Sequence, residues 1–302
     1  MTTPPSPSVR VAAVQMVSGT TVDANLRSAE ALIAQAVAAG AELVALPEYF
    51  CLMGANDLDK VAAREADGHG PVQDFLAAQA RRHAIWLVGG TTPIATDSPQ
   101  HVRNSVLVYD PQGARVARYD KIHLFNFRKG DESYDEARTI EPGRAVSTFT
   151  FTARAGGTLK VGLSVCYDLR FPELYRAMER PDLILVPAAF TATTGRAHWT
   201  TLLKARAIEN LCYVLAPAQG GRHENGRATY GHSMLVDPWG GIVDEVADGP
   251  GVAIGLVDPQ LIAEVRMQIE ASLQASPLSE EDGMAERVGP NRLSPRNLSQ
   301  TA

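Results

Sequence analysis

Short apolar runs alternate with amphipathic stretches in the N-terminal part of the chain. Strands are predicted over residues 9–16, 43–46 and 85–88, and the last two are apolar throughout. Runs this short and this apolar are typical of strands buried on both faces of a sheet. Between them, helical spacing predicts one helix that Asp23 caps and Gly40 ends, and a second from Pro71 to about Arg82. The apolar face of the first helix comprises Leu26, Ala29, Ile33 and Val37.

The second half of the chain repeats this pattern. Its predicted strands are residues 160–165, 183–186 and 213–216, and the second of these is apolar throughout. One helix is expected from Pro172 to about Arg180, and another over residues 197–210. The core-facing residues expected on the second helix are Leu202, Leu203, Ala205 and Ile208. Hairpins with Asp-Pro-x-Gly turns are expected over residues 105–118 and 233–243. Strands that alternate with helices indicate an α/β fold.

Two short segments of the first half have echoes in the second half. Residues 108–113 resemble residues 235–240, and residues 46–50 resemble residues 186–190. Matches this short can arise by chance. The other interpretation is a pseudo-twofold fold, in which two αβ halves place their sheets face to face. Glu48 and Ala188 would then occupy equivalent positions, with a carboxylate in one half only.

Length and composition narrow the classes of protein. The 302 residues predict one domain over residues 9–270, with a mobile lead at 1–8 and a loosely held tail at 271–302. A net charge of −6 does not favour nucleic-acid binding. No apolar run is long enough to span a membrane, and the N-terminus has no secretory signal pattern. Three cysteines without a CxxC pair fit a reducing compartment, so we expect a cytoplasmic protein.

Cys166 is the first candidate for chemistry, because it ends an apolar strand and precedes a turn. A thiol there can find backbone N–H groups that stabilise an oxyanion. The alternative is a buried structural cysteine, which is the expectation for Cys51 and Cys212. The seven histidines show neither a zinc-binding spacing nor an evident pairing with a cysteine. A carboxylate is therefore considered as the base.

Two charged residues lie in apolar surroundings. Glu48 follows a buried strand, where burial would raise its basicity; a helix cap or a loop salt bridge is the alternative. Lys121 lies beside Ile122, Leu124 and Phe125, although most lysines are ordinary surface residues. Neither a GxGxxG motif nor a P-loop occurs, so no nucleotide cofactor is expected.

Three segments in this order resemble the nitrilase (carbon–nitrogen hydrolase) superfamily. They are Leu-Pro-Glu-Tyr at 46–49, Tyr-Asp-Lys-Ile-His-Leu-Phe at 119–125, and Ser-Val-Cys-Tyr-Asp-Leu-Arg-Phe-Pro-Glu-Leu at 164–174. The resemblance implies a four-layer α-β-β-α sandwich. It also implies a triad of Glu48 as general base and acid, Lys121 for the oxyanion and Cys166 as nucleophile, helped by the Tyr167 backbone N–H.

The same resemblance implies a second glutamate, which positions Lys121 and the substrate. It falls on Glu136, with Glu132 and Glu141 as rivals in the same loop. The family further implies a small-molecule substrate, no metal or cofactor, and a homodimer or larger homo-oligomer. A non-catalytic protein on this fold is disfavoured, because all three triad residues are present.

A narrower resemblance concerns the branch that hydrolyses deaminated glutathione, an ω-amide of a 2-oxo acid, and its ω-amidase relatives. Residues 187–199, 203–210 and 230–240 carry it, whereas residues 265–272 depart from the branch. It implies hydrolysis of such an amide with release of ammonia; nitrile or N-carbamoyl amino acid hydrolysis is the alternative. The substrate-binding candidates are Phe190, Thr191, Arg196 and Arg222. Arg170 is expected to pair with Asp168 or Glu173 instead.

Overall fold

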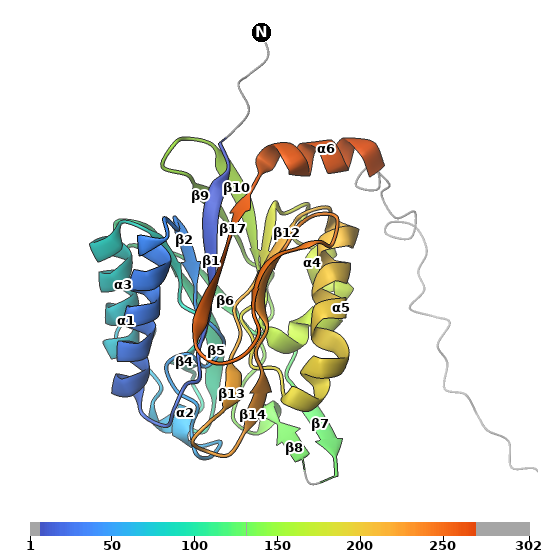
Figure 1. The fold of residues 1–302 in the computed structure, drawn as a ribbon. Helices are drawn as coiled ribbons and strands as arrows, with labels where there is room; N and C mark the ends of the chain where they lie inside the picture. Colours follow the sequence, from blue (N-terminus) through green and yellow to red (C-terminus); the bar gives the residue numbers. More distant parts are fainter. Residues whose placement is uncertain (1–6, 131, 270–302) are drawn as a thin grey trace, which may run out of the picture.

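Two β-sheets stack face to face, and helices cover the outer face of each (Figure 1). The computed structural model describes residues 7–130 and 132–269. The first sheet contains β1 (Val9–Gln15), β2 (Leu43–Ala45), β3 (Trp86–Val88), β4 (Thr92–Ala95), β5 (Val102–Tyr109), β6 (Arg115–Asp120) and β17 (Gly251–Val257). The second contains β9 (Thr148–Thr152), β10 (Thr158–Leu163), β11 (Leu183–Leu185), β12 (Tyr213–Ala216), β15 (Ser233–Val236) and β16 (Ile242–Val246).

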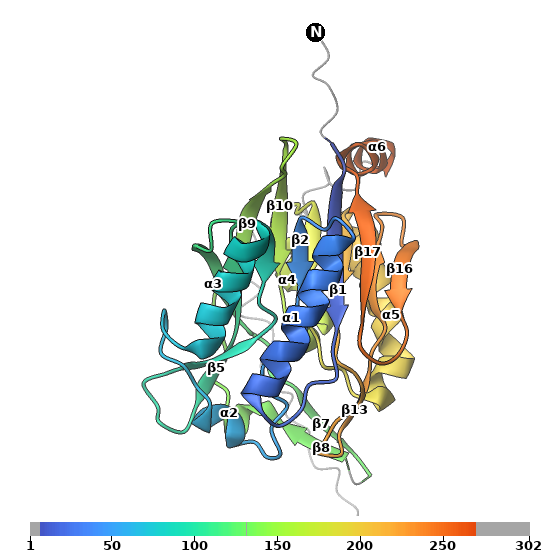
Figure 2. The ribbon, with the colours of Figure 1, turned by 60° about the vertical axis from the view of Figure 1, so that its left-hand side comes forward.

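The helices complete the outer layers. α1 (Val22–Ala38) and α3 (Pro71–His83) cover the first sheet, and α4 (Pro172–Arg176) and α5 (Ala192–Asn210) cover the second (Figures 1 and 2). Short elements lie at the lower edge in Figure 1: α2 (Asp59–Ala62), the pair β7 (Asn126–Lys129) and β8 (Glu132–Asp135), and the pair β13 (Gly220–Arg222) and β14 (Ala228–Tyr230). α6 (Pro259–Ile269) lies at the opposite end. The expected four-layer α-β-β-α sandwich is confirmed.

The two halves repeat one strand order. In the first half β1, β2 and β3 pair in parallel, and β3–β5 and β5–β6 pair antiparallel. In the second half β10, β11 and β12 pair in parallel, and β12–β15 and β15–β16 pair antiparallel. The register agrees as well, since Leu46 N–H donates to Val88 and Val186 N–H donates to Leu215. Glu48 and Ala188 therefore follow equivalent strands, as the pseudo-twofold interpretation predicts.

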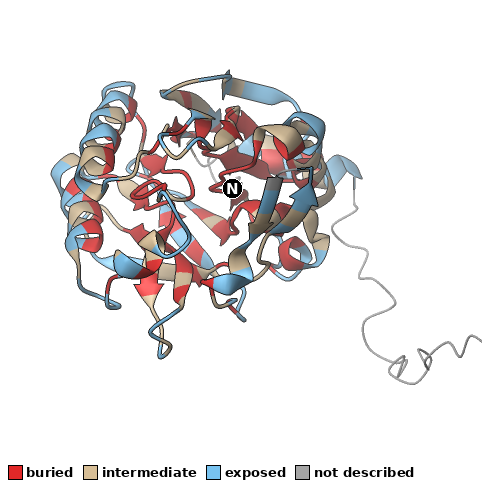
Figure 3. Ribbon diagram, turned by 90° about the horizontal axis from the view of Figure 1, so that it is seen from below, coloured by how far each residue is buried: buried red, intermediate tan, exposed pale blue. Residues whose placement is uncertain are grey.

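The alternation of side chains along β1 explains why its central residues 11–14 are all apolar. Val11 and Ala13 pack in the cluster between the sheets, together with Val161 of the second sheet. Ala12 belongs to the other cluster, beneath α1 and α3. Successive side chains of a strand point to opposite faces, so a strand between two apolar layers needs apolar residues at every position. Seen from below, the buried residues are concentrated in these middle layers (Figure 3).

Several helix boundaries differ from the predictions. The position before α1 is Thr21, and Asp23 is exposed in the first turn. α4 ends at Arg176, since Glu179 and Arg180 adopt positive φ just before Pro181, where a helix cannot continue. α5 begins at Ala192, capped by the Thr191 side chain, which accepts from Thr194 N–H.

The predicted core face of α5 was also partly wrong. Ile208 is 48% exposed, whereas Trp199, Leu203 and Ala207 are buried. These three positions repeat every four residues and set the buried face, which turns Ile208 outward. Leu203 is therefore the one core residue of that prediction which is fully buried.

Four strands of the two sheets were not fully predicted from sequence. They are β4, β9, β17 and the part of β16 after Val243. β17 pairs antiparallel with β1 along its whole length, so it joins the end of the described chain to its beginning. No described helix has the length and apolarity needed to cross a membrane. The predicted tail at 271–302 lies outside the described residues, as does most of the predicted lead at 1–8.

Candidate active site

Three strand ends bring Glu48, Lys121 and Cys166 to one edge of the sandwich. Glu48 follows β2, Lys121 follows β6, and Cys166 follows β10. The exposed fractions of these residues are only 1%, 0% and 7%, respectively. Ends of parallel strands are where α/β folds place their ligand sites, because loops there are free to carry polar groups.

The buried Lys121 forms ion pairs with two carboxylates, those of Glu48 and Glu136. Lys121 Nζ lies 2.9 Å from Glu48 Oε1 and 2.8 Å from Glu136 Oε2. The nearby rival Glu141 pairs with Arg103 instead, 3.0 Å away. The structure thus brings together the triad glutamate, the triad lysine and the glutamate chosen as the second one.

Backbone and amide donors fix both carboxylates. Asn104 Nδ2 donates to Glu48 Oε1, and Ala189 N–H donates to Glu48 Oε2, each over 2.9 Å. Glu136 accepts from the Tyr49 hydroxyl and from the Phe125 N–H, over 2.8 and 2.7 Å. Charge-assisted hydrogen bonds of this length hold a carboxylate in one orientation. Asn104 and Tyr49 were not predicted from sequence. Neither the strand that contains Asn104 nor the Pro-Glu-Tyr segment that contains Tyr49 indicates which carboxylate the side chain will contact.

Cys166 begins the 3₁₀ helix η2 (Cys166–Arg170) with a φ of 50°. This left-handed conformation is uncommon for a residue with a side chain and occurs often at functional sites. The Cys166 N–H donates to the Pro187 carbonyl over 2.9 Å, which ties the turn to the end of β11. The Tyr167 N–H lies in the first turn, where N–H groups have no acceptor inside the helix. Tyr167 also lines the cavity that Cys166 borders.

Asp168 connects the cysteine turn to the lysine segment. Its fully buried carboxylate accepts from the Tyr119 hydroxyl over 2.7 Å and from the Val165 N–H over 2.9 Å. It also accepts from the His123 N–H over 3.0 Å. Residues 119–123 flank Lys121 and residue 165 precedes Cys166, so this one carboxylate sets their relative position.

The ionisation of the cluster follows from its burial and charges. Although burial alone would lower it, the pKa of Lys121 is raised by Glu136 and Glu48. Burial favours a higher pKa for Glu136, but Lys121 and the hydrogen bonds to the carboxylate bring that pKa below its ordinary value. Burial and then the Glu48 charge raise the pKa of the Cys166 thiol well above its ordinary value, against the smaller effect of Lys121. Two carboxylates facing one ammonium do not favour a thiolate beside them.

We therefore expect the Cys166 thiol to remain protonated in the resting protein from about pH 6 to pH 8, below the reference thiol pKa of about 8.5. An unfolded chain releases this proton near that reference value, so the stability contributed by the protonated thiol is present below it and falls as the pH rises towards the folded-state pKa. The measurement is the ultraviolet thiolate absorbance of the protein minus that of Cys166→Ala across this range. A flat difference is expected, and a titration near neutral pH would contradict the electrostatic account.

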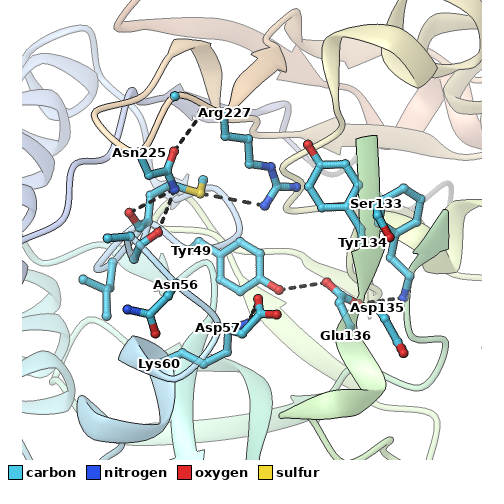
Figure 4. Close-up of a pocket in the computed structure, with 16 residues that line it drawn as sticks. Tyr49, Asn56, Asp57, Lys60, Ser133, Tyr134, Asp135, Glu136, Asn225 and Arg227 are labelled. Carbon is cyan, nitrogen blue, oxygen red and sulfur yellow. Dashed lines mark hydrogen bonds and ion pairs between the residues drawn. The ribbon is translucent and has the colours of Figure 1, made fainter. Parts of the chain in front are cut away.

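Two cavities meet at the site. The inner one, about 10 Å³, is bordered by Cys166, Glu48 and Glu136, with Phe190 and Thr191 from the segment after β11. That volume is roughly enough for one water molecule. The outer pocket, about 390 Å³, opens beside it and shares Phe125, Glu136 and Arg227 with it (Figure 4).

The predicted substrate-binding residues divide into two groups. Phe190 and Thr191 line the inner cavity, whereas Arg196 and Arg222 are exposed and line neither of the two cavities. Arg196 lies on the solvent face of α5, and Arg222 points outward at the end of β13, so the expectation for these two arginines needs correction.

Two other arginines line the inner cavity, Arg170 and Arg227. Arg170 pairs with neither Asp168 nor Glu173; its Nη2 lies 3.3 Å from His198 Nδ1, and its guanidinium lies over the Tyr167 ring. Arg227 was missed, because residues 220–230 showed no signal for the hairpin that folds it inward.

The other two cysteines and the possible metal-binding side chains were also considered as functional groups. Cys51 and Cys212 are buried, as predicted, and burial raises the pKa of both, that of Cys51 to about 12. Among residues 7–130 and 132–269, no three or more His, Cys, Asp or Glu side chains are arranged to hold a metal ion.

Comparison with known protein families shows to which family the chain belongs. The model of the carbon-nitrogen hydrolase family matches residues 10–267. The chain belongs to the carbon–nitrogen hydrolase family. Among its relatives, the deaminated glutathione amidase of Synechocystis sp. is 42% identical over 263 residues, which cover 85% of this chain and 94% of that protein.

Solved structures of other carbon–nitrogen hydrolases agree. The NitFhit protein of Caenorhabditis elegans is 33% identical with a TM-score of 0.80, over 90% of this chain and 66% of that longer chain. The amidase from Nesterenkonia sp. AN1 is 25% identical with a TM-score of 0.70, over 88% of this chain and 100% of that chain. That structure, of a mutant, shows acrylamide added at the active-site cysteine. As a carbon–nitrogen hydrolase with amidase relatives, the chain is an enzyme that hydrolyses amides.

Proposed function

We propose that this enzyme hydrolyses deaminated glutathione, or a related ω-amide of a 2-oxo acid, through a thioester on Cys166. The observation that carries the mechanism is the buried Glu48–Lys121–Glu136 cluster beside the Cys166 cavity. The substrate class is supported by the relatives named deaminated glutathione amidase, which include the Synechocystis protein.

Glu48 acts as the base in the first step. Because the Cys166 thiol is protonated at rest, its proton passes to Glu48 as the sulfur attacks the amide carbonyl. A C–S bond forms, and the carbonyl π electrons move to the oxygen. The negative oxygen is met by the Tyr167 N–H and by Lys121. An ammonium has three N–H donors, and Glu48 and Glu136 together occupy two of them, so one remains for the oxyanion.

The second half of the reaction returns the enzyme to its starting state. The C–N bond breaks as Glu48 gives its proton to the departing amine, which leaves a thioester on Cys166. Water then attacks the thioester while Glu48 accepts its proton. As the C–S bond breaks, Glu48 gives this proton to the departing sulfur, which regenerates the thiol and the Glu48 carboxylate. Glu136 holds Lys121 in place throughout, by the ion pair of 2.8 Å.

The amine that leaves depends on the substrate. Ammonia leaves from a primary amide such as 2-oxoglutaramate. In deaminated glutathione the γ-amide nitrogen belongs to cysteinylglycine, so the dipeptide leaves and 2-oxoglutarate is formed. The release of ammonia expected from sequence therefore applies only to the primary amides.

A comparison of kcat/KM tests this proposal, with deaminated glutathione, 2-oxoglutaramate, an aliphatic nitrile and an N-carbamoyl amino acid as substrates. We expect the 2-oxo ω-amides to react best, because the cavity-lining Arg170 suits the carboxylate of a 2-oxo acyl half. Deaminated glutathione should come first, because its dipeptide half carries a second carboxylate, which Arg227 suits. A nitrile or an N-carbamoyl amino acid as the best substrate would leave only the family assignment standing.

A cytoplasmic location and a homo-oligomeric state are part of the same proposal. Three free cysteines support a reducing compartment. Exposed large apolar side chains support self-association: Ile208, Trp239 and Val243 are 48%, 53% and 45% exposed.

A further inference from the structure

The outer pocket brings charged groups of both signs to the mouth of the Cys166 cavity: its cations are Arg227 and Lys60, and its carboxylates are Asp57, Asp135 and Glu136. Arg227 and Lys60 enter it from opposite sides, with the Tyr49 ring between them (Figure 4). Lys60 Nζ donates to Thr139 Oγ1 over 3.3 Å and lies 3.5 Å from Asp57 Oδ1, whose carboxylate is 56% exposed. The pocket volume of about 390 Å³ falls within the range of small-molecule sites.

Arg227 is held in place without a counter-ion. Its Nη2 donates to the Ala189 carbonyl over 2.9 Å, and its guanidinium lies 5.0 Å from the centre of the Tyr134 ring. No carboxylate of the described residues lies within ion-pair distance of it, and its buried Nε has no hydrogen-bond partner among them. A guanidinium fixed by neutral contacts is ready to pair with a ligand carboxylate.

Arg170 and Arg227 differ in which cavity they reach. Arg170 lines only the inner cavity, whereas Arg227 lines both the inner cavity and the outer pocket. The acyl half of a substrate becomes bonded to Cys166 and therefore lies on the inner side. The inner cavity, about 10 Å³, has room for roughly one water molecule and does not enclose the acyl half, so the outer pocket of about 390 Å³ is the space available to a bulky leaving group.

We propose that the outer pocket is a subsite for the leaving amine, and that it takes a short peptide whose C-terminal carboxylate pairs with Arg227. This assignment rests on the proposed function, under which the substrate carries one carboxylate on its 2-oxo acyl half and another on its dipeptide half. Arg170 then serves the acyl half, Arg227 serves the dipeptide half, and Lys60 adds positive charge on the opposite wall. The subsite determines specificity for N-substituted ω-amides over primary ones.

The test compares three substrates in the wild type and in Arg227→Gln: deaminated glutathione, its C-terminal carboxamide, and 2-oxoglutaramate. We expect the wild type to prefer the free acid to the carboxamide by about tenfold or more in kcat/KM, the range for a hydrogen-bonded charged pair. Arg227→Gln should lose most of that preference through a higher KM for the acid. Its kcat/KM for 2-oxoglutaramate, which has no dipeptide half, should change by less than about threefold.

Two further variants separate charge recognition from folding. Arg227→Lys keeps the charge and should retain part of the preference, even if Arg227→Gln folds poorly. Arg128→Gln, at an exposed arginine on β7 that does not line the pocket, should leave the preference unchanged. Equal losses on deaminated glutathione and 2-oxoglutaramate in Arg227→Gln would overturn the subsite. A wild type that hydrolyses neither would instead overturn the proposed function.

Discussion

Replacing Cys166 by alanine is expected to abolish turnover of every amide substrate while leaving the fold intact. The sulfur forms the only covalent bond to the substrate in the proposed mechanism, so no other group can replace it. Alanine tolerates a φ of 50° about as well as cysteine does, and loss of the sulfur leaves only a small cavity beside an existing one. Steady-state rates and a thermal unfolding curve measure the two parts of this prediction.

Cys212→Ala provides the matched control. Cys212 is equally buried, but it packs in the core between α5 and β12, far along the chain from the triad segments. This variant should keep its activity and lose some stability, the reverse of Cys166→Ala. Residual activity of Cys166→Ala near that of the wild type would show that the nucleophile lies elsewhere.

Glu48→Gln is expected to lower kcat by about 100-fold or more, at the low end of contributions from general acid–base catalysis. The substitution preserves shape but removes one of the two carboxylates of the described residues, Glu48 and Glu136, that border the Cys166 cavity and contact Lys121. Both the thiol proton and the proton for the departing amine would lose their carrier. The rate of a single turnover, measured at saturating substrate, isolates this effect from binding.

Asn104→Ala is the corresponding control for Glu48, because it removes a hydrogen bond to the same carboxylate oxygen and leaves the base in place. We expect a smaller loss of kcat than in Glu48→Gln. If Glu48→Gln instead retained nearly native kcat, Glu136 would be the group that transfers the proton.

Much of the fold follows from sequence, since strands between two apolar layers must be apolar on both faces, as residues 11–14 and 183–185 are. The edge strand β17 was harder to recognise, because its pairing with β1 joins residues about as far apart as the domain allows. No local pattern encodes such a long-range pairing.

The site was predictable where a residue type is unusual in its surroundings. A glutamate after a buried strand and a lysine among apolar neighbours both stand out in the sequence. Arg227, Asn104 and Asp168 do not, because their roles arise from contacts with residues distant in the chain. Arg196 and Arg222 were chosen from sequence because arginines in loops after strands suit carboxylate substrates. The structure shows that both are exposed, whereas Arg227 lines the inner cavity.

The most direct test of the central claim is intact-mass spectrometry of the enzyme, quenched in acid during turnover of deaminated glutathione. Peptide mapping then locates any adduct. The mechanism predicts a 2-oxoglutaryl adduct on Cys166, absent from Cys166→Ala and from the enzyme without substrate. An adduct on Cys51 or Cys212, or turnover that persists in Cys166→Ala, would contradict it.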